Sequence, residues 1–155
     1  VTADRLQDPS TTETQKIALL NDLSQKNGWF IKLENPGEKC LSVPVVFYGI
    51  VYYTTFSPTL GSEADICFVG EGESRLYALQ YKTGNAVFNL DGLGTMDNLT
   101  RSDRSMTIGA TIPSGVIITF IRGISVGYVG IGGGVYKPKL FSDRSIIPVT
   151  WRIVF

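Results

Sequence analysis

The stretch from Cys40 to Leu90, CLSVPVVFYGIVYYTTFSPTLGSEADICFVGEGESRLYALQYKTGNAVFNL, decides the fold that the rest of the chain can adopt. It begins with two β-rich runs, Leu41 to Phe47 and Ile50 to Phe56, which the turn Tyr48-Gly49 joins. After a loop rich in glycine and acidic residues come two more runs, joined by the turn at residues 82–85. This order of runs and turns predicts a four-stranded antiparallel meander.

The first two of these strands are apolar on both faces. In the first run, Val45 and Phe47 alternate with Val46 and Tyr48. An antiparallel strand with one solvated face alternates apolar and polar residues, so these strands should be covered on both sides. A β-propeller blade between other blades meets this condition, and so does an inner strand of a β-sandwich.

Composition limits the classes of function. The chain has 155 residues, 43% of them hydrophobic and 18% charged, which is typical of one folded domain. Its 14 basic and 14 acidic residues cancel, so no charge excess favours nucleic acid or an anionic membrane. No apolar run reaches the roughly 18 residues of a spanning helix. Because the chain opens on Val1 without an apolar signal segment, we expect a processed or trimmed product.

The chain contains no histidine, so the usual general base and the commonest nitrogen ligand for metals are missing. Serine or cysteine triads of the familiar kind are therefore excluded. The two cysteines, Cys40 and Cys67, lie 27 residues apart in the same meander. We expect them to form a disulfide, which would contribute roughly 3 to 4 kcal/mol. Two reduced thiols are the alternative, and two cysteines alone do not distinguish these states.

The N-terminal region predicts one helix. Residues 1–11 are polar and read as an arm, and the spacing of Thr12 and Gln15 is that of a capping box. The apolar stripe that follows and the stop signal Asn27-Gly28 predict a helix from Thr12 to Lys26. Residues 1–27 therefore form an arm and a helix, and a short strand is expected from Gly28 to Leu33.

The second half of the chain repeats the pattern of the first. Its predicted strands are Gly115 to Ile121, Ile124 to Ile131, Val135 to Leu140 and Pro148 to Phe155, and the turn Arg122-Gly123 joins the first two. Similar short motifs recur around the aromatic residues Trp29, Phe88 and Trp151. The first two lie 59 positions apart and the last two 63.

A period near 60 residues with four short strands is typical of a β-propeller blade. The sequence thus predicts an all-β fold of two four-stranded, blade-like meanders, residues 28–90 and 108–155, preceded by the N-terminal helix. Two blades cannot close a ring of about four to eight. We therefore expect a partial β-propeller whose outer faces are covered by another copy or another protein, or two sheets that fold onto each other.

Two segments could bind ligands. Asn89, Asp91 and Asp97 lie in a loop with the outline of a calcium site, but Leu93 offers no side-chain oxygen at the fifth position. A simple connecting loop is the alternative. Aromatic residues of the first two strands could form a sugar-stacking platform, although at strand spacing they are more often core: Phe47, Tyr48, Tyr52, Tyr53 and Phe56.

Several strings in this order, KCLSVPVVFYGIVYYTTFSP, DICFVGEGESRLYALQYKTGNAVF, IGATIPSGVII and YVGIGGGVY, resemble the C-terminal β-propeller of the PilY/PilC type IV pilus tip-associated proteins. The similarity covers about Gly28 to Phe155. It implies a protein at the cell surface or pilus tip that takes part in pilus extension, retraction and attachment. It also implies an oxidising location, where a Cys40–Cys67 bond would be stable.

The family often has a calcium loop of the form DxDxDGxxxD, and the matching segment, Asn89 to Asp97, departs from it at the first and fifth positions. Cofactors other than calcium are not expected. The expected function is non-enzymatic binding, to pilin or pilus-tip subunits, to a companion chain that completes the propeller, or to another copy. A repeating or accessory subunit of an extracellular filament is the main alternative. A fragment of a quinoprotein-type enzyme would need a complete ring around its cofactor.

Overall fold

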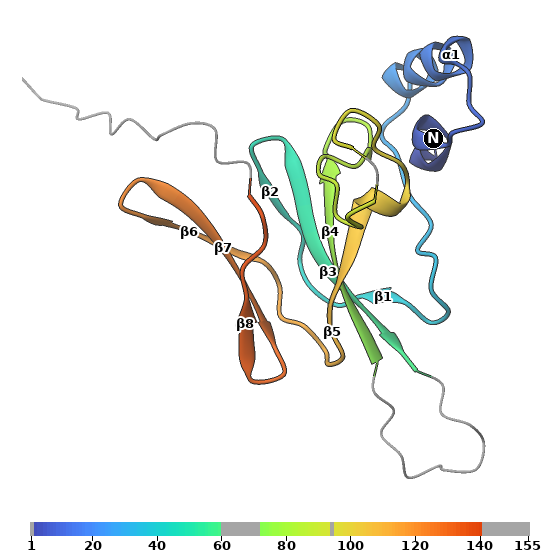
Figure 1. Ribbon diagram of the computed structural model, residues 1–155. Coiled ribbons are helices and arrows are strands. Elements are labelled where there is room, and N and C mark those ends of the chain that lie inside the picture. The colour runs from blue at the N-terminus through green and yellow to red at the C-terminus, as the bar shows by residue number, and fades with distance from the viewer. Residues whose placement is uncertain (1, 60–71, 94, 141–155) are drawn as a thin grey trace, which may run out of the picture.

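The computed structural model describes residues 2–59, 72–93 and 95–140. The described chain consists mainly of antiparallel β-strands with one α-helix, as the sequence predicted (Figure 1). The strands form two sheets of different size. This confirms the β-rich class, whereas the predicted pair of four-stranded units differs from the sheets that are present.

The first sheet has five strands, arranged as β1-β3-β4-β5 with β2 pairing the same edge of β3 as β1. Their bounds are β1 (Lys39–Cys40), β2 (Val45–Phe47), β3 (Ile50–Pro58), β4 (Gly72–Gln80) and β5 (Ser105–Gly109). Within the described ranges, the second sheet has three strands in the order β6-β7-β8. Their bounds are β6 (Ile117–Ile121), β7 (Ile124–Ile131) and β8 (Gly134–Tyr136).

Three helical segments complete the described chain: η1 (Ala3–Gln7), α1 (Glu13–Ser24) and η2 (Ser102–Arg104). The predicted helix is confirmed as α1, and Thr12 and Gln15 form the expected capping box at its start. No residue of α1 is buried. Figure 1 shows α1 beside η1, away from both sheets.

The two predicted X-Gly turns join hairpins β2–β3 and β6–β7. Tyr48 and Gly49 have φ of +48° and +76°, and Arg122 and Gly123 have φ of +52° and +80°. Positive φ at both central residues is the type I′ pattern, whose twist matches that of antiparallel strands. The sequence therefore located both hairpins correctly.

The predicted fourth strand of the first meander, residues 86–90, is wrong. Only Ala86 bridges Leu79 there, and β5 pairs with β4 as the sheet's next strand. The reason is packing, because Phe88 is buried in the first core and Val87 and Leu90 pack against it. The run packs its side chains against this core instead of extending the edge of the sheet.

Other strand predictions are too long. The run Leu41 to Phe47 is ordered as β2 only at its end, because the Ser42 hydroxyl accepts the hydrogen bond from Thr54 N at 3.2 Å and Pro44 has no N–H. Gly28 to Leu33 contributes a single bridge, Phe30 with Thr2. The strand expected at Val135 to Leu140 ends at Tyr136, before Pro138. The strand Pro148 to Phe155 lies outside the described residues.

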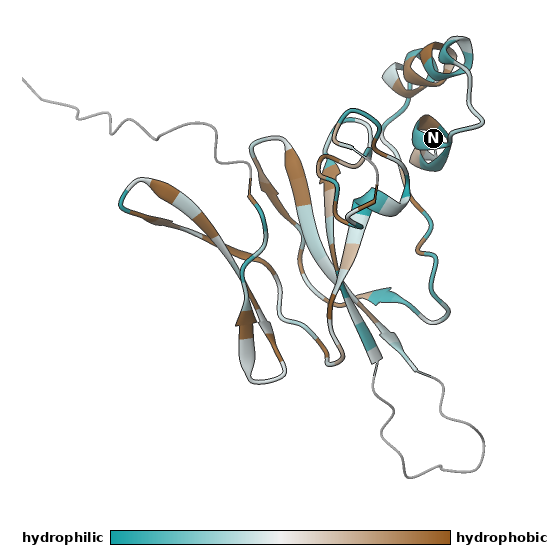
Figure 2. Ribbon diagram, viewed as in Figure 1, coloured by the Kyte–Doolittle hydropathy of each residue, from teal (hydrophilic) through white to brown (hydrophobic). Residues whose placement is uncertain are grey.

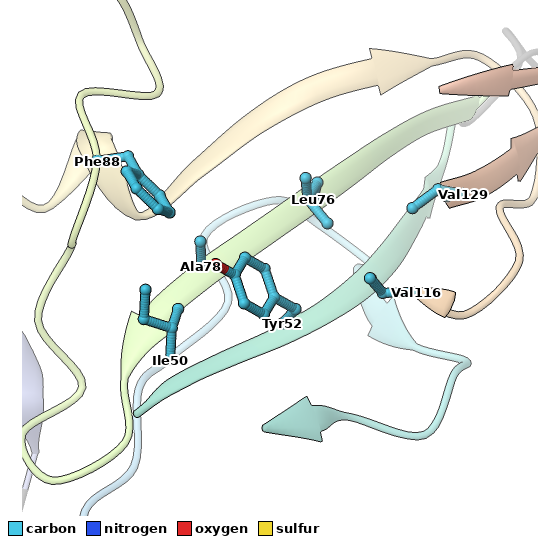
Figure 3. Close-up of a cluster of buried hydrophobic side chains, with 7 residues drawn as sticks. All are labelled: Ile50, Tyr52, Leu76, Ala78, Phe88, Val116 and Val129. Carbon is cyan, nitrogen blue, oxygen red and sulfur yellow. The ribbon is translucent and has the colours of Figure 1, made fainter. Parts of the chain in front are cut away.

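Both faces of β3 and β4 are buried by the chain itself. On one face, Ile50, Tyr52, Leu76 and Ala78 pack with Phe88, Val116 and Val129, the last from β7 of the second sheet (Figure 3). On the other face, Tyr53, Tyr77 and Leu79 pack with the N-terminal segment through Trp29, Ile31 and Leu33. The covering of both faces predicted for the first two runs is confirmed for β3 and wrong for the run that contains β2, where Val43 and Val46 are exposed.

The turn at residues 82–85 holds this N-terminal cover in place. Trp29 Nε1 donates a hydrogen bond to Tyr81 O at 2.8 Å. Gly84 has φ of +70°, and a Cβ there would lie 2.6 Å from the Trp29 ring and 2.8 Å from Ala3 Cβ. Only glycine satisfies both the backbone conformation and the close approach.

Among the described residues, the second sheet is covered on one face only. The register β6–β7 pairs Ile117 with Tyr128 and Ile121 with Ile124, which places these side chains on one side of the sheet. We call this side the outer face. Its large aliphatic residues are exposed by 47 to 65%: Ile117, Ile121, Ile124 and Val135. Figure 2 shows the hydrophobic colouring on β6 and β8.

Candidate functional site

A polar hollow of about 450 Å³ lies between β4–β5 and the N-terminal segment. Four basic residues line it, Lys32, Arg75, Arg101 and Arg104, against two carboxylates, Glu34 and Asp91. We call it the arginine hollow. Its walls come from three separate parts of the sequence, which the fold brings together.

Arg104 is the anchor of this site, with only 4% of its side chain exposed. Its guanidinium donates to Asp4 Oδ1 and to Ala3 O, each at 2.7 Å, and to Gln7 Oε1 at 3.3 Å. Burial lowers the pKa of the guanidinium, and the Asp4 carboxylate opposes that shift. Because all its partners lie on η1, Arg104 fastens η1 to the start of β5.

The other two arginines lie nearer the solvent. Arg75 Nε pairs with Glu73 Oε1 at 3.0 Å, and its Nη1 donates to Ser105 Oγ at 2.9 Å. The Thr107 hydroxyl, and to a lesser extent Arg75, lower the pKa of Glu73. Arg101 Nη2 pairs with Glu34 Oε1 at 3.0 Å in an exposed position. These exposed pairs hold their partners weakly, so a ligand anion could replace Glu34 on Arg101.

A buried carboxylate lies behind the hollow. Glu38 Oε1 accepts hydrogen bonds from Thr55 Oγ1 at 2.6 Å and from the Tyr77 hydroxyl at 2.9 Å. Tyr77 stacks on Tyr53 with ring centroids 4.8 Å apart. Burial is the main cause that raises the pKa of both tyrosines. Neutral hydroxyls therefore surround Glu38, which makes this cluster a structural network.

The side chains of this hollow suit an anionic ligand. The hollow offers guanidinium groups and hydroxyls, and in the described chain it contains neither a cysteine nor a histidine. Arginine favours planar anions such as carboxylates, sulfates and phosphates. The hollow could thus hold an anionic group of a ligand at its open side, near Arg101 and Lys32.

The side chains of two predicted calcium ligands, Asn89 and Asp91, form hydrogen bonds within their own loop. The Asn89 side chain is used by its own loop, since Oδ1 accepts from Gly92 N at 2.7 Å and Nδ2 donates to Leu93 O at 2.8 Å. Asp91 Oδ1 accepts from Leu93 N at 2.8 Å, and Asp97 is exposed. In the described ranges, no three His, Cys, Asp or Glu side chains gather to hold a metal ion. The calcium site at Asn89, Asp91 and Asp97 stays a prediction.

The predicted disulfide joins one cysteine inside the described ranges to one outside them. Cys40 lies on β1 with an exposed free thiol, whose Sγ is 3.3 Å from Ser42 O. Cys67 lies outside the described residues. The Cys40–Cys67 pairing stays a prediction.

The aromatic residues of the first meander are divided between core and surface. Tyr52 and Tyr53 are buried, so the core interpretation is correct for them. Tyr48 is exposed at the hairpin turn.

The arginine hollow was not predicted from the sequence, because Arg101 and Arg104 lie in a polar segment that is typical of a simple connection. A buried arginine leaves no periodic signal in a sequence.

Comparison with known proteins finds no matching family model, no matching curated protein and no matching solved structure. The resemblance to the PilY/PilC proteins thus rests on the sequence strings alone. Within the described parts of the chain, no helix has the length and apolar character that crossing a membrane requires.

Proposed function

We propose that this chain is a non-enzymatic binding module of a cell-surface or pilus-tip protein that acts in type IV pilus biogenesis and adhesion. The observation that carries the proposal is the outer face of the second sheet. Its aliphatic residues are exposed although the strands that bear them are apolar on both sides. A contiguous apolar surface of this kind typically marks a protein–protein interface.

The first sheet supports the same proposal by contrast. The chain itself covers both faces of β3 and β4, whereas the outer face of the second sheet keeps its aliphatic residues exposed, so we place the partner there. In a partial β-propeller, the next blade would lie at that place. The companion is then the remainder of the propeller, or a pilin or pilus-tip subunit that packs there instead.

Two measurements on the purified chain test this function. The first is binding of a hydrophobic dye together with light scattering, and the second is association with purified pilin and pilus-tip proteins. The double variant Ile117→Ser and Ile124→Ser should lose most dye binding and at least about tenfold in partner affinity, since it removes the apolar centre of the face. The matched control is Ile17→Ser and Leu20→Ser, which alters equally exposed aliphatic residues of α1.

A monomer that binds neither dye nor any pilus protein would overturn the proposal. The same conclusion would follow if the α1 control lost as much partner binding as the outer-face variant. Partner binding by the double variant at the wild-type level would also count against the second sheet as the interface.

A repeating subunit of an extracellular filament is the second candidate. It is favoured by β6, whose sequence Ile117–Ile121 contains no charge and no proline and which, among described strands, pairs only with β7. Natural edge strands are usually protected by such residues, so β6 could pair with a strand of the next copy. Electron micrographs distinguish the two, since a subunit repeats along a fibre and an adhesin is terminal. Phe120→Pro should abolish fibres if β6 pairing builds them, because Phe120 forms a non-hydrogen-bonded pair with Ser125 and its N–H faces away from β7.

A further inference from the structure

One cationic group of the arginine hollow is paired with a carboxylate of the chain itself. Glu34 Oε1 lies 3.0 Å from Arg101 Nη2, and both side chains line the hollow. The side chains of Glu34 and Arg101 are 62% and 44% exposed. Exposed pairs of this kind are held weakly, and a guanidinium group binds any planar carboxylate in the same way. A carboxylate from a ligand can therefore replace that of Glu34 on Arg101.

Two further arginines of the hollow are neutralised from outside it. Arg104 Nη1 lies 2.7 Å from Asp4 Oδ1, and Arg75 Nε lies 3.0 Å from Glu73 Oε1. Asp4 and Glu73 are not among the residues that line the hollow, whereas the two arginines are. These pairs hold both guanidinium groups in fixed positions in the wall. They leave the charge balance of the hollow to its other residues.

The remaining charges of the hollow decide which anion it accepts. They are those of Lys32, Arg101, Glu34 and Asp91, which cancel. Lys32 is exposed and is the basic residue of the hollow that forms no ion pair within the described ranges. Once Glu34 turns to the solvent, the hollow has an excess of one positive charge. A single carboxylate balances this excess, whereas a doubly charged phosphate exceeds it.

The rest of the wall indicates the body of the ligand. It consists mainly of apolar side chains and hydroxyl groups: Ile31, Leu90, Met106, Ser102, Ser105 and Thr107. The volume of about 450 Å³ lies in the range of sites for small molecules. A sugar ring offers both C–H surface and hydroxyl groups, so it matches this mixed wall better than a hydrocarbon does.

We propose that the arginine hollow binds a sugar acid, a monosaccharide with a single carboxylate such as a uronic acid. The carboxylate binds Arg101 and Lys32 in place of Glu34, and the ring lies against the apolar and hydroxyl-bearing wall. The dissociation constant expected for a ligand of about 13 non-hydrogen atoms is about 10⁻³ M. The site does not depend on the proposed function, because the residues of the outer face take no part in it.

The test is a titration of the whole chain with sodium D-glucuronate, followed by the ¹H–¹⁵N NMR spectrum. The amides of Ile31, Ser102 and Ser105 should shift and saturate with a dissociation constant of about 10⁻³ M. Three other probes should bind at least about tenfold more weakly, because each lacks one part of the ligand or exceeds its charge. They are D-glucose without a charge, acetate without a ring, and glucose 6-phosphate with two charges.

Variants of the exchanging pair distinguish binding from a purely structural role. Glu34→Gln should bind glucuronate about threefold more tightly, because its amide no longer competes for Arg101. Arg101→Gln and Lys32→Gln should each bind at least about tenfold more weakly. The matched controls Asp22→Asn and Lys26→Gln alter an exposed ion pair of the N-terminal region and should bind as the wild type does.

The proposal is overturned if glucuronate causes no saturable shifts, or if Glu34→Gln binds it no more tightly than the wild type. Equal binding of glucose 6-phosphate would overturn the single carboxylate, and equal binding of acetate would overturn the sugar ring. The outer-face variant Ile117→Ser and Ile124→Ser should bind glucuronate as the wild type does. Failure of the sugar-acid site can thus be distinguished from failure of the proposed function.

Discussion

The two sheets are made from similar strands but end in different surroundings. In the first sheet, β3 and β4 bury both faces, one against the second sheet and the other against the segment from Trp29 to Leu33. In the second sheet, the inner residues join the same core, while Ile117, Ile121 and Ile124 face solvent. A strand that is apolar on both sides therefore predicts that both of its faces are buried. It does not predict which segment or partner buries them.

Within this protein, the buried residues of the first sheet should therefore determine stability, and the exposed residues of the second sheet should determine binding. A buried apolar side chain stabilises the fold in proportion to the surface area that folding removes from water. An exposed aliphatic side chain on the outer face contributes little to folding and is available for a partner. Matched mutations in the two sheets should therefore have very different effects on the free energy of unfolding.

The largest expected effect comes from the shared core. Leu76→Ala in β4, where Leu76 is 2% exposed, should lower the free energy of unfolding by about 3 to 4 kcal/mol through lost burial and a cavity. The matched change Ile117→Ala, at a residue 64% exposed, should stay within about 0.5 kcal/mol. Urea unfolding followed by tyrosine and tryptophan fluorescence measures both. Similar losses at the two sites would show that the outer face is buried in solution.

The next effect concerns the cover of the first sheet. Arg104→Ala should cost about 3 kcal/mol, because Asp4 and Gln7 lose their partner in a mostly buried place. Arg101→Ala removes only the exposed pair with Glu34 and should cost less than about 1 kcal/mol. Both values come from the same urea titration. Limited proteolysis should then cut the N-terminal segment of Arg104→Ala faster than that of Arg101→Ala, and equal cutting would contradict the anchoring role.

The sequence located the local features of this fold well and the long-range ones less well. The capping box at Thr12 and the two X-Gly turns are short signals that depend on neighbouring residues, and all three are confirmed. The fourth strand was misplaced because the run containing Phe88 has strand-like composition, while its burial depends on residues far along the chain. Propensity does not distinguish a strand from an extended segment that crosses a core.

The candidate site was less accessible to prediction. Asp91 was named from loop spacing, but Arg101 and Arg104 of the same hollow belong to a later segment, and Arg104 finds its partners near the N-terminus. Arg104 and Asp4 lie 100 residues apart in the sequence, so no local pattern predicts their contact. Sites assembled from distant segments need the fold first.

A smaller effect should appear at alkaline pH on the face covered by the N-terminal segment. Burial raises the pKa of Tyr53 in the folded protein above its unfolded value of about 10. The unfolded state then loses its proton first, so stability is unaffected below about pH 10 and falls above it. Tyr53→Phe should reduce the slope of this loss by about 1.4 kcal/mol per pH unit. Urea unfolding at a series of alkaline pH values measures the slope, and an unchanged slope would mean that Tyr53 is open to solvent.

The smallest effect is expected in α1, which exposes aliphatic residues as the outer face of the second sheet does. Thr12→Ala removes the cap that accepts from Gln15 N, which should destabilise the isolated helix by about 1 kcal/mol. Because no residue of α1 is buried, the urea midpoint of the two sheets should hardly change. Hydrogen exchange should instead accelerate about fivefold for the amides of α1 alone. If global unfolding of the chain loses the full 1 kcal/mol or so, α1 folds cooperatively with the sheets. Exposed aliphatic residues would then not identify which parts of this protein bind a partner.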